Sequence, residues 1–260
     1  MASSSNELPP LRISDVYALL SRSDQARNAI LVGGQAANFW AVRYGLRAEG
    51  VMVSADVDFI GTPQAAMQAG LEWEGRVDLP GFGDFTPNTA VVYMDFAGGS
   101  RAIDFLDSVL GVNKEELNRM AVTVTFSERD DFQIRVMHPF HCMVSQLTNA
   151  YGKSLNRRAD PKSGDWVAER AFISVQTLNH NLQEYLDKGS VNTATRIVRK
   201  IMVFSTKAPA LSAFQRDGID VLEAIPENHP GWKAGFMQTV YEPLHKKVVR
   251  KRNTKKADKS

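Results

Sequence analysis

The hydrophobic periodicity of the chain changes near Pro139, and this change restricts the folds that the chain can adopt. Before this proline, short apolar runs of strand length alternate with helical patterns. After it, the clear patterns up to residue 245 have the spacing of amphipathic helices. We therefore expect an α/β (α+β) chain. We expect a short mixed sheet flanked by helices in residues 1–137, a helical domain in 138–245 and a tail in 246–260.

The tail differs from the rest of the chain in charge. Residues 246–260, KKVVRKRNTKKADKS, contain eight Lys and Arg against Asp258 alone, which is a net charge of +7. Because the whole chain is only +2, the residues before the tail carry −5. Runs of like charge are typical of disordered segments that bind polyanions. We expect a disordered basic tail that either contacts nucleic acid such as RNA or is simply solvated.

The remaining composition limits the cellular setting and the kinds of site. Cys142 is the one cysteine, so an internal disulfide and a zinc site built from several cysteines are excluded. The N-terminal sequence MASSSNELPP lacks the basic and apolar regions of a secretory signal, and no apolar run is long enough to span a bilayer. We expect a cytoplasmic protein that does not associate with membranes.

Two aspartates interrupt the segment ADVDFIG, which otherwise has the composition of a buried strand. Side chains two apart on a strand share a face, so Asp56 and Asp58 lie together while Val57 and Phe59 face the core. Two adjacent carboxylates raise each other's pKa unless a cation lies between them, and Mg²⁺ prefers such oxygen ligands. Asp104, in RAIDFL, supplies a third carboxylate from another strand. Three carboxylates around two metal ions can support phosphoryl transfer.

A glycine pair precedes these aspartates in AILVGGQAANFW, where an apolar strand ends and a helical pattern begins. Backbone N–H groups at a helix start attract anions, and glycine lets a phosphate approach the backbone closely. We expect Gly33 and Gly34 to bind phosphate, with Gln35 as an additional side-chain donor. The same two glycines are also explained by a tight strand-to-helix turn that binds nothing.

The acidic residues also have a simpler explanation. In this explanation, Asp56 and Asp58 are an exposed pair at the end of a strand and bind no ligand. Asp95 and Asp107 compete with Asp104 for the role of third carboxylate, because both lie near it in the sequence. We favour Asp104, since apolar residues flank it on both sides.

The ordered set LVGGQAANFW, ADVDFIG and AIDFL resembles the nucleotidyltransferase superfamily of DNA polymerase β. More narrowly, it is similar to the abortive-infection (AbiEii-like) branch, whose members include toxins of toxin–antitoxin pairs. The resemblance covers residues 28–107 and implies the minimal nucleotidyltransferase fold. Gly33 and Gly34 match the turn of that fold, Asp56 and Asp58 match its metal pair, and Asp104 matches its third carboxylate.

The same resemblance implies the substrates and partners. It implies a nucleoside triphosphate such as ATP, two Mg²⁺ ions, and a helical second half that closes the other side of a cleft. It also implies an RNA acceptor, such as the 3′ end of a tRNA reached with the help of the basic tail, and an antitoxin protein as a partner.

Two features depart from the family pattern. The connection between the glycine pair and the Asp-x-Asp pair is longer than usual, through an insertion around LRAEGVMVS. The lysine that this branch carries after its catalytic half has no clear counterpart. Gln146 lies near its place, and Lys153 is our candidate for a phosphate contact, with Arg157 and Arg158 just beyond.

These observations predict a Mg²⁺-dependent nucleotidyltransferase that transfers a nucleoside monophosphate to a hydroxyl group, with RNA as the favoured acceptor. One alternative is a small-molecule, antibiotic-type nucleotidyltransferase, which requires a compact acidic acceptor pocket and no basic tail. A second alternative is a non-catalytic module that binds a nucleotide or a protein on the same fold. It requires binding of Mg²⁺ and nucleotide without turnover.

Overall fold

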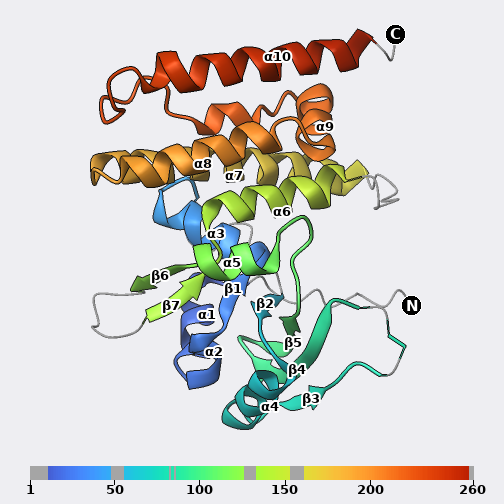
Figure 1. Ribbon diagram of the computed structural model, residues 1–260. Coiled ribbons are helices and arrows are strands. Elements are labelled where there is room, and N and C mark those ends of the chain that lie inside the picture. The colour runs from blue at the N-terminus through green and yellow to red at the C-terminus, as the bar shows by residue number, and fades with distance from the viewer. Residues whose placement is uncertain are drawn as a thin grey trace. The chain divides into compact units, whose positions relative to one another are not determined.

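The computed structural model of this 260-residue chain describes residues 11–47, 56–81, 83–84, 86–125, 133–152 and 161–257. Within these ranges, the side chains at 13, 25, 161–167 and 251–257 are not described. The chain divides into two compact units, Met1–Cys142 and Met143–Ser260. The division falls within helix α6 (Pro139–Tyr151), slightly beyond the boundary after residue 137 that the periodicity predicts. Figure 1 traces both units along the chain.

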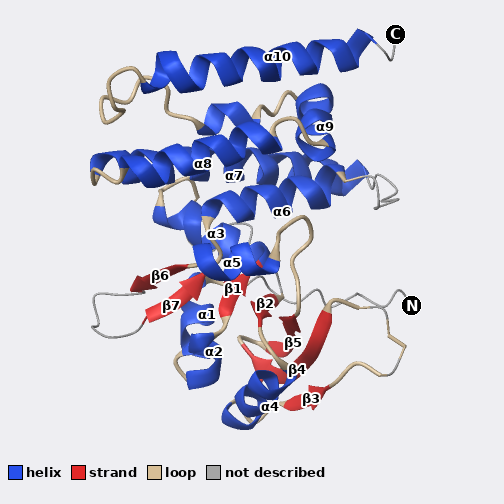
Figure 2. Ribbon diagram, in the orientation of Figure 1, coloured by secondary structure: helices blue, strands red, loops and turns tan. Residues whose placement is uncertain are grey.

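The first unit alternates helices and strands, as the pattern before Pro139 predicts. Among the described residues, strands occur only in this unit (Figure 2). Its helices are α1 (Ile13–Leu20), α2 (Asp24–Asn28), α3 (Gly33–Arg43), α4 (Pro63–Glu72) and α5 (Lys114–Met120). Its strands are β1 (Ile30–Val32), β2 (Val57–Ile60), β3 (Arg76–Asp78), β4 (Asn88–Phe96), β5 (Gly99–Leu106), β6 (Val122–Thr125) and β7 (Gln133–Val136).

The described strands form one mixed sheet in the order β3-β4-β5-β2-β1-β7-β6. Strand β2 lies at its centre, antiparallel to β1 and parallel to β5. Strand β4 pairs with β5 and β6 pairs with β7, and both pairs are antiparallel. The prediction of a mixed α/β chain is therefore confirmed.

The core of this unit determines which residues are left for a site. Val57 and Phe59 of β2 and Ile103 and Phe105 of β5 are all buried, as predicted for β2. The rings of Phe59 and Phe105 pack with their centroids 5.6 Å apart, and α3 packs against β1 and β2. Because side chains alternate along a strand, the residues between these apolar ones point to the opposite face of the sheet. The predicted aspartates lie on that opposite face.

The second unit is helical, as the pattern after Pro139 predicts. Helix α8 shows why, because its buried residues recur three and four positions apart and give it one apolar face. No described helix of either unit has the length and apolar character needed to cross a membrane. After the end of α6, the elements are α7 (Pro161–Asp187), α8 (Val191–Phe204), α9 (Ala208–Asp217), the 3₁₀ helix η1 (Val221–Ala224), the π-helix η2 (Met237–Tyr241) and α10 (Glu242–Ala257).

The basic tail requires a correction. Residues 246–257 are not disordered but form most of helix α10, and residues 258–260 lie outside the described part of the chain. Lys and Arg are good helix formers, so a run of them does not by itself prevent a helix. The half-buried Leu244 and the buried Val248 attach the first turns of α10 to the unit. The charge run alone therefore did not predict the backbone of residues 246–257.

Candidate functional site

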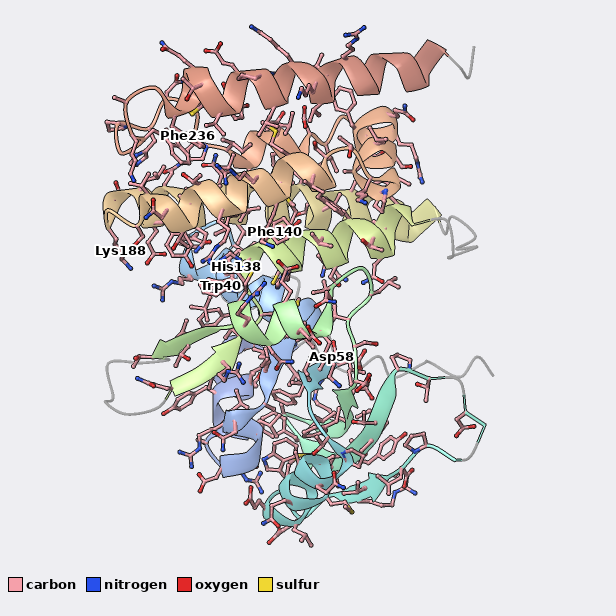
Figure 3. All side chains as sticks on the ribbon, viewed as in Figure 1. Trp40, Asp58, His138, Phe140, Lys188 and Phe236 are labelled. Carbon is pink, nitrogen blue, oxygen red and sulfur yellow. The ribbon has the colours of Figure 1, made fainter. Side chains whose placement is uncertain are left out.

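Two of the three predicted aspartates lie side by side on neighbouring strands. Asp58 is in β2, where it pairs in register with Asp104 of the parallel strand β5. Asp56 lies immediately before β2. Residues in register on adjacent strands project from the same face of a sheet, so the side chains of Asp58 and Asp104 are neighbours. Asp58 is labelled in Figure 3.

The pKa values of these residues show that their carboxylates interact. Burial, together with the charges of Asp104 and Asp56, raises the pKa of Asp58 to about 7. Burial and the charge of Asp56 also raise the pKa of Asp104, whereas a hydrogen bond from Asn88 lowers it. Raised carboxylate pKa values in a group of like charges indicate concentrated negative charge, as is common at functional sites.

The donor set suits a hard divalent cation. Within the described residues, no three or more His, Cys, Asp and Glu side chains are arranged as a ready-made metal cage. Mg²⁺ does not require one, because it is usually held by one or two carboxylates while water and substrate phosphates complete its octahedral shell. Asp58 and Asp104 present carboxylates of this kind. Their raised pKa values indicate that the ionised carboxylates are unfavourable here, and a bound cation compensates their negative charge.

Gly33 and Gly34 are the first two residues of α3, directly after β1, and we call this turn the glycine corner. This corner lies directly against Asp58. Gly33 begins α3 with a φ of +63°, a conformation that L-residues with side chains rarely adopt. A Cβ at this position lies only 1.9 Å from Oδ2 of Asp58, so the carboxylate occupies the space that a side chain needs. Both Gly33 and Gly34 are only half-buried, which leaves part of the helix start accessible to an anion. Strand β1, the corner and β2 thus bring the glycine pair and the carboxylates together.

The other predicted ligand-binding residues are placed differently. Gln35 is fully buried, and its Nε2 donates to the backbone carbonyl of Asp56 over 3.5 Å. The structure therefore gives Gln35 a role in holding the segment before β2. Lys153, Arg157 and Arg158 lie outside the described residues, as does most of the predicted insertion LRAEGVMVS.

Sequence reasoning missed two polar residues at the start of β4. Asn88 donates from Nδ2 to Oδ1 of Asp104 over 3.0 Å, and Thr89 donates from Oγ1 to the carbonyls of Gly61 and Phe105, each at 3.0 Å. Asn88 therefore orients the third carboxylate, while Thr89 joins the ends of β2 and β5. Neither residue carries a local signal, because both contacts depend on the pairing of β4 with β5.

Comparisons with protein-family models, with curated proteins and with solved structures gave no match for this chain. The resemblance to nucleotidyltransferases therefore stays a prediction from the order of its motifs. The case for a function rests on the geometry and electrostatics of the residues described above.

Proposed function

We propose that the chain is a metal-dependent nucleotidyltransferase that transfers a nucleoside monophosphate from a nucleoside triphosphate to an acceptor hydroxyl. The observation that carries this proposal is the in-register pair of Asp58 and Asp104, whose coupled carboxylates lie beside the glycine corner of α3. A triphosphate needs both elements: backbone N–H groups for its phosphate oxygens and carboxylates that recruit its cation.

The three carboxylates share one task in this reaction, and Asp104 has a second one. Asp56, Asp58 and Asp104 are the residues that would hold Mg²⁺, which when bound neutralises phosphate charge and acidifies an acceptor hydroxyl. Asn88 occupies Oδ1 of Asp104, so we assign the acceptor proton to Oδ2 of the same carboxylate. The deprotonated acceptor oxygen forms a bond to the α-phosphorus, the bond to the bridging oxygen breaks, and pyrophosphate leaves.

Transfer of labelled nucleotide tests this proposal directly. We expect the purified protein, incubated with Mg²⁺, each of the four α-³²P-labelled triphosphates and total RNA, to label RNA. Asp56→Ala should abolish labelling, because the exposed Asp56 contributes charge to the site and little to the core. The matched control is Asp95→Ala, which removes an exposed carboxylate from β4 and should leave labelling unchanged. Binding of Mg²⁺ and nucleotide without any transfer would instead identify a non-catalytic module.

Helix α10 favours RNA as the acceptor, since seven of its sixteen residues are Lys or Arg. Changing Arg250, Lys251, Arg252, Lys255 and Lys256 to Gln removes charge while it retains good helix formers and the anchors Leu244 and Val248. We expect RNA labelling to fall by about 10-fold or more at physiological salt and to lose much of its salt dependence. Helicity by circular dichroism provides the control. Unchanged RNA labelling would contradict an RNA-binding role for α10.

Asn88 provides a further prediction about the reaction. Asn88→Leu removes the hydrogen bond that lowers the pKa of Asp104, so that pKa should rise. Because the reaction needs Asp104 ionised, the acidic limb of the pH–rate profile should move to higher pH, and the loss of rate should be largest on the acidic side of the profile. Asn88→Gln, which retains an amide, should recover part of the lost rate. A uniform loss of rate at every pH would argue instead for a structural role.

A further inference from the structure

A groove with a mostly apolar lining lies between α8 and α10 in the second unit. It has a volume of about 460 Å³. Val203, the second-to-last residue of α8, is 61% exposed in this groove, which is a large exposed fraction for an apolar side chain. Each helix contributes residues three and four positions apart, which form one stripe along each helix. The lining consists of Arg199, Met202 and Val203 from α8, Thr206 just after the end of α8, and Leu244, Lys247 and Val248 from α10.

The rim of the groove is positively charged. The exposed Arg199 and Lys247 lie on its two helices, and no acidic residue is among its described lining. Lys246, next to the groove on α10, is also exposed. A ligand that covers the apolar floor therefore has to carry negative charge along its edges if the contact is to be electrostatically complementary.

We propose that this groove binds an acidic amphipathic helix of a protein partner. Such a helix supplies an apolar stripe for Met202, Val203 and Leu244, and its flanking Glu and Asp residues pair with the cationic rim. RNA fits this surface less well, because the apolar floor offers nothing to a sugar–phosphate backbone. A symmetric contact with a second copy is also disfavoured, because it places the same cationic rims against each other.

The proposal does not depend on the transferase activity, because the groove lies wholly within the helical unit. It does have a consequence for the proposed RNA contact. Lys247 belongs to the helix whose cations we assign to RNA, so the acidic helix and RNA should compete for α10.

A designed peptide tests the proposal on the full chain. The probe is a fluorescein-labelled peptide of about five helical turns. Leu residues recur along it at i, i+3, i+4 and i+7, which places them on one face, and the other positions are Glu. One control peptide has the same composition in scrambled order, and a second replaces Glu by Gln. Fluorescence anisotropy should show that the amphipathic acidic peptide binds at least about tenfold more tightly than either control.

Variants of the protein locate the binding surface. Val203→Asp should weaken peptide binding by about tenfold or more, and Lys247→Glu by several-fold. Phe172→Asp is the matched control, since Phe172 is also a large exposed apolar residue (46% exposed) of this unit but does not line the groove. Binding of labelled single-stranded RNA should fall with Lys247→Glu and remain unchanged with Val203→Asp.

Three results would overturn the proposal. The first is equal binding of the amphipathic and scrambled peptides, and the second is unchanged peptide affinity in the Val203→Asp variant. The third is binding of a different occupant at Val203. RNA or anionic phosphatidylserine vesicles would then bind in a Val203-dependent way while the peptide does not bind. A second copy of the chain would instead give Val203-dependent dimerisation in light scattering.

Discussion

Asp58→Asn should abolish nucleotide transfer and at the same time stabilise the metal-free protein. Loss of a carboxylate that would hold Mg²⁺ should lower the rate by about 10³-fold, which corresponds to an increase of about 4 kcal/mol in the activation free energy. The stability effect has the opposite sign because burial and two neighbouring charges raise the pKa of Asp58 to about 7. At pH 8 the folded protein keeps this carboxylate ionised in an unfavourable place. Replacing it by a neutral amide of the same shape should therefore raise the free energy of unfolding by on the order of 2–4 kcal/mol.

The pH dependence of stability separates this explanation from a packing effect. Between about pH 4 and pH 7 the folded state holds a proton on Asp58 that the unfolded state has released. The free energy of unfolding of the metal-free wild type should therefore fall as the pH rises through this range and become level above it. Asp58→Asn should remove most of this slope, and so should added Mg²⁺ in the wild type, because the cation compensates the ionised carboxylate.

Urea titrations at several pH values, with Mg²⁺ and with EDTA, measure these effects. Asp95→Asn is the control, because Asp95 is an exposed carboxylate of the same sheet and should change the unfolding free energy by less than about 0.5 kcal/mol. If Asp58→Asn destabilised the metal-free protein at pH 8, the carboxylates would not be the concentrated negative charge that the proposal requires.

The carboxylate site was largely predictable from the sequence because strand geometry is strict. Alternation along a strand places Val57 and Phe59 in the core, and the apolar neighbours of Asp104 identify the same arrangement in β5. The register that places Asp58 beside Asp104 depends on the parallel pairing of β2 with β5. The sequence suggested that pairing but did not determine it, because strands distant along the chain carry no local pairing signal.

Other features depend on contacts that no local pattern encodes. Asn88 contacts Asp104 only because β4 folds back on β5, with an irregular register next to Asn88 itself. The continuation of α10 through the basic residues was missed because the apolar residues of this helix end early, so its second half lacks the periodicity that identifies amphipathic helices. Its helical structure depends on side-chain propensity together with anchoring by Leu244 and Val248.

Gly33→Ala should produce the second large effect, on both stability and nucleotide binding. The positive φ of this residue costs an alanine about 1 kcal/mol. The added Cβ also lies 1.9 Å from Oδ2 of Asp58, so the carboxylate has to move away from the corner. We expect a total destabilisation of about 2–4 kcal/mol and a loss of Mg²⁺-dependent triphosphate binding, measured by denaturation and by calorimetry.

Gly45→Ala provides a matched control for the backbone contribution. Gly45 has nearly the same φ, +68°, but a Cβ added there meets nothing within 4 Å, so it should show only the conformational cost. A double-mutant cycle of Gly33→Ala with Asp58→Ala then isolates the contact between the two positions. If the clash with the carboxylate dominates, Gly33→Ala should cost little more in the Asp58→Ala background than Gly45→Ala costs in the wild type. Equal costs of Gly33→Ala in both backgrounds would mean that Asp58 does not lie against the glycine corner, and the phosphate-binding role of that corner would lose its main support.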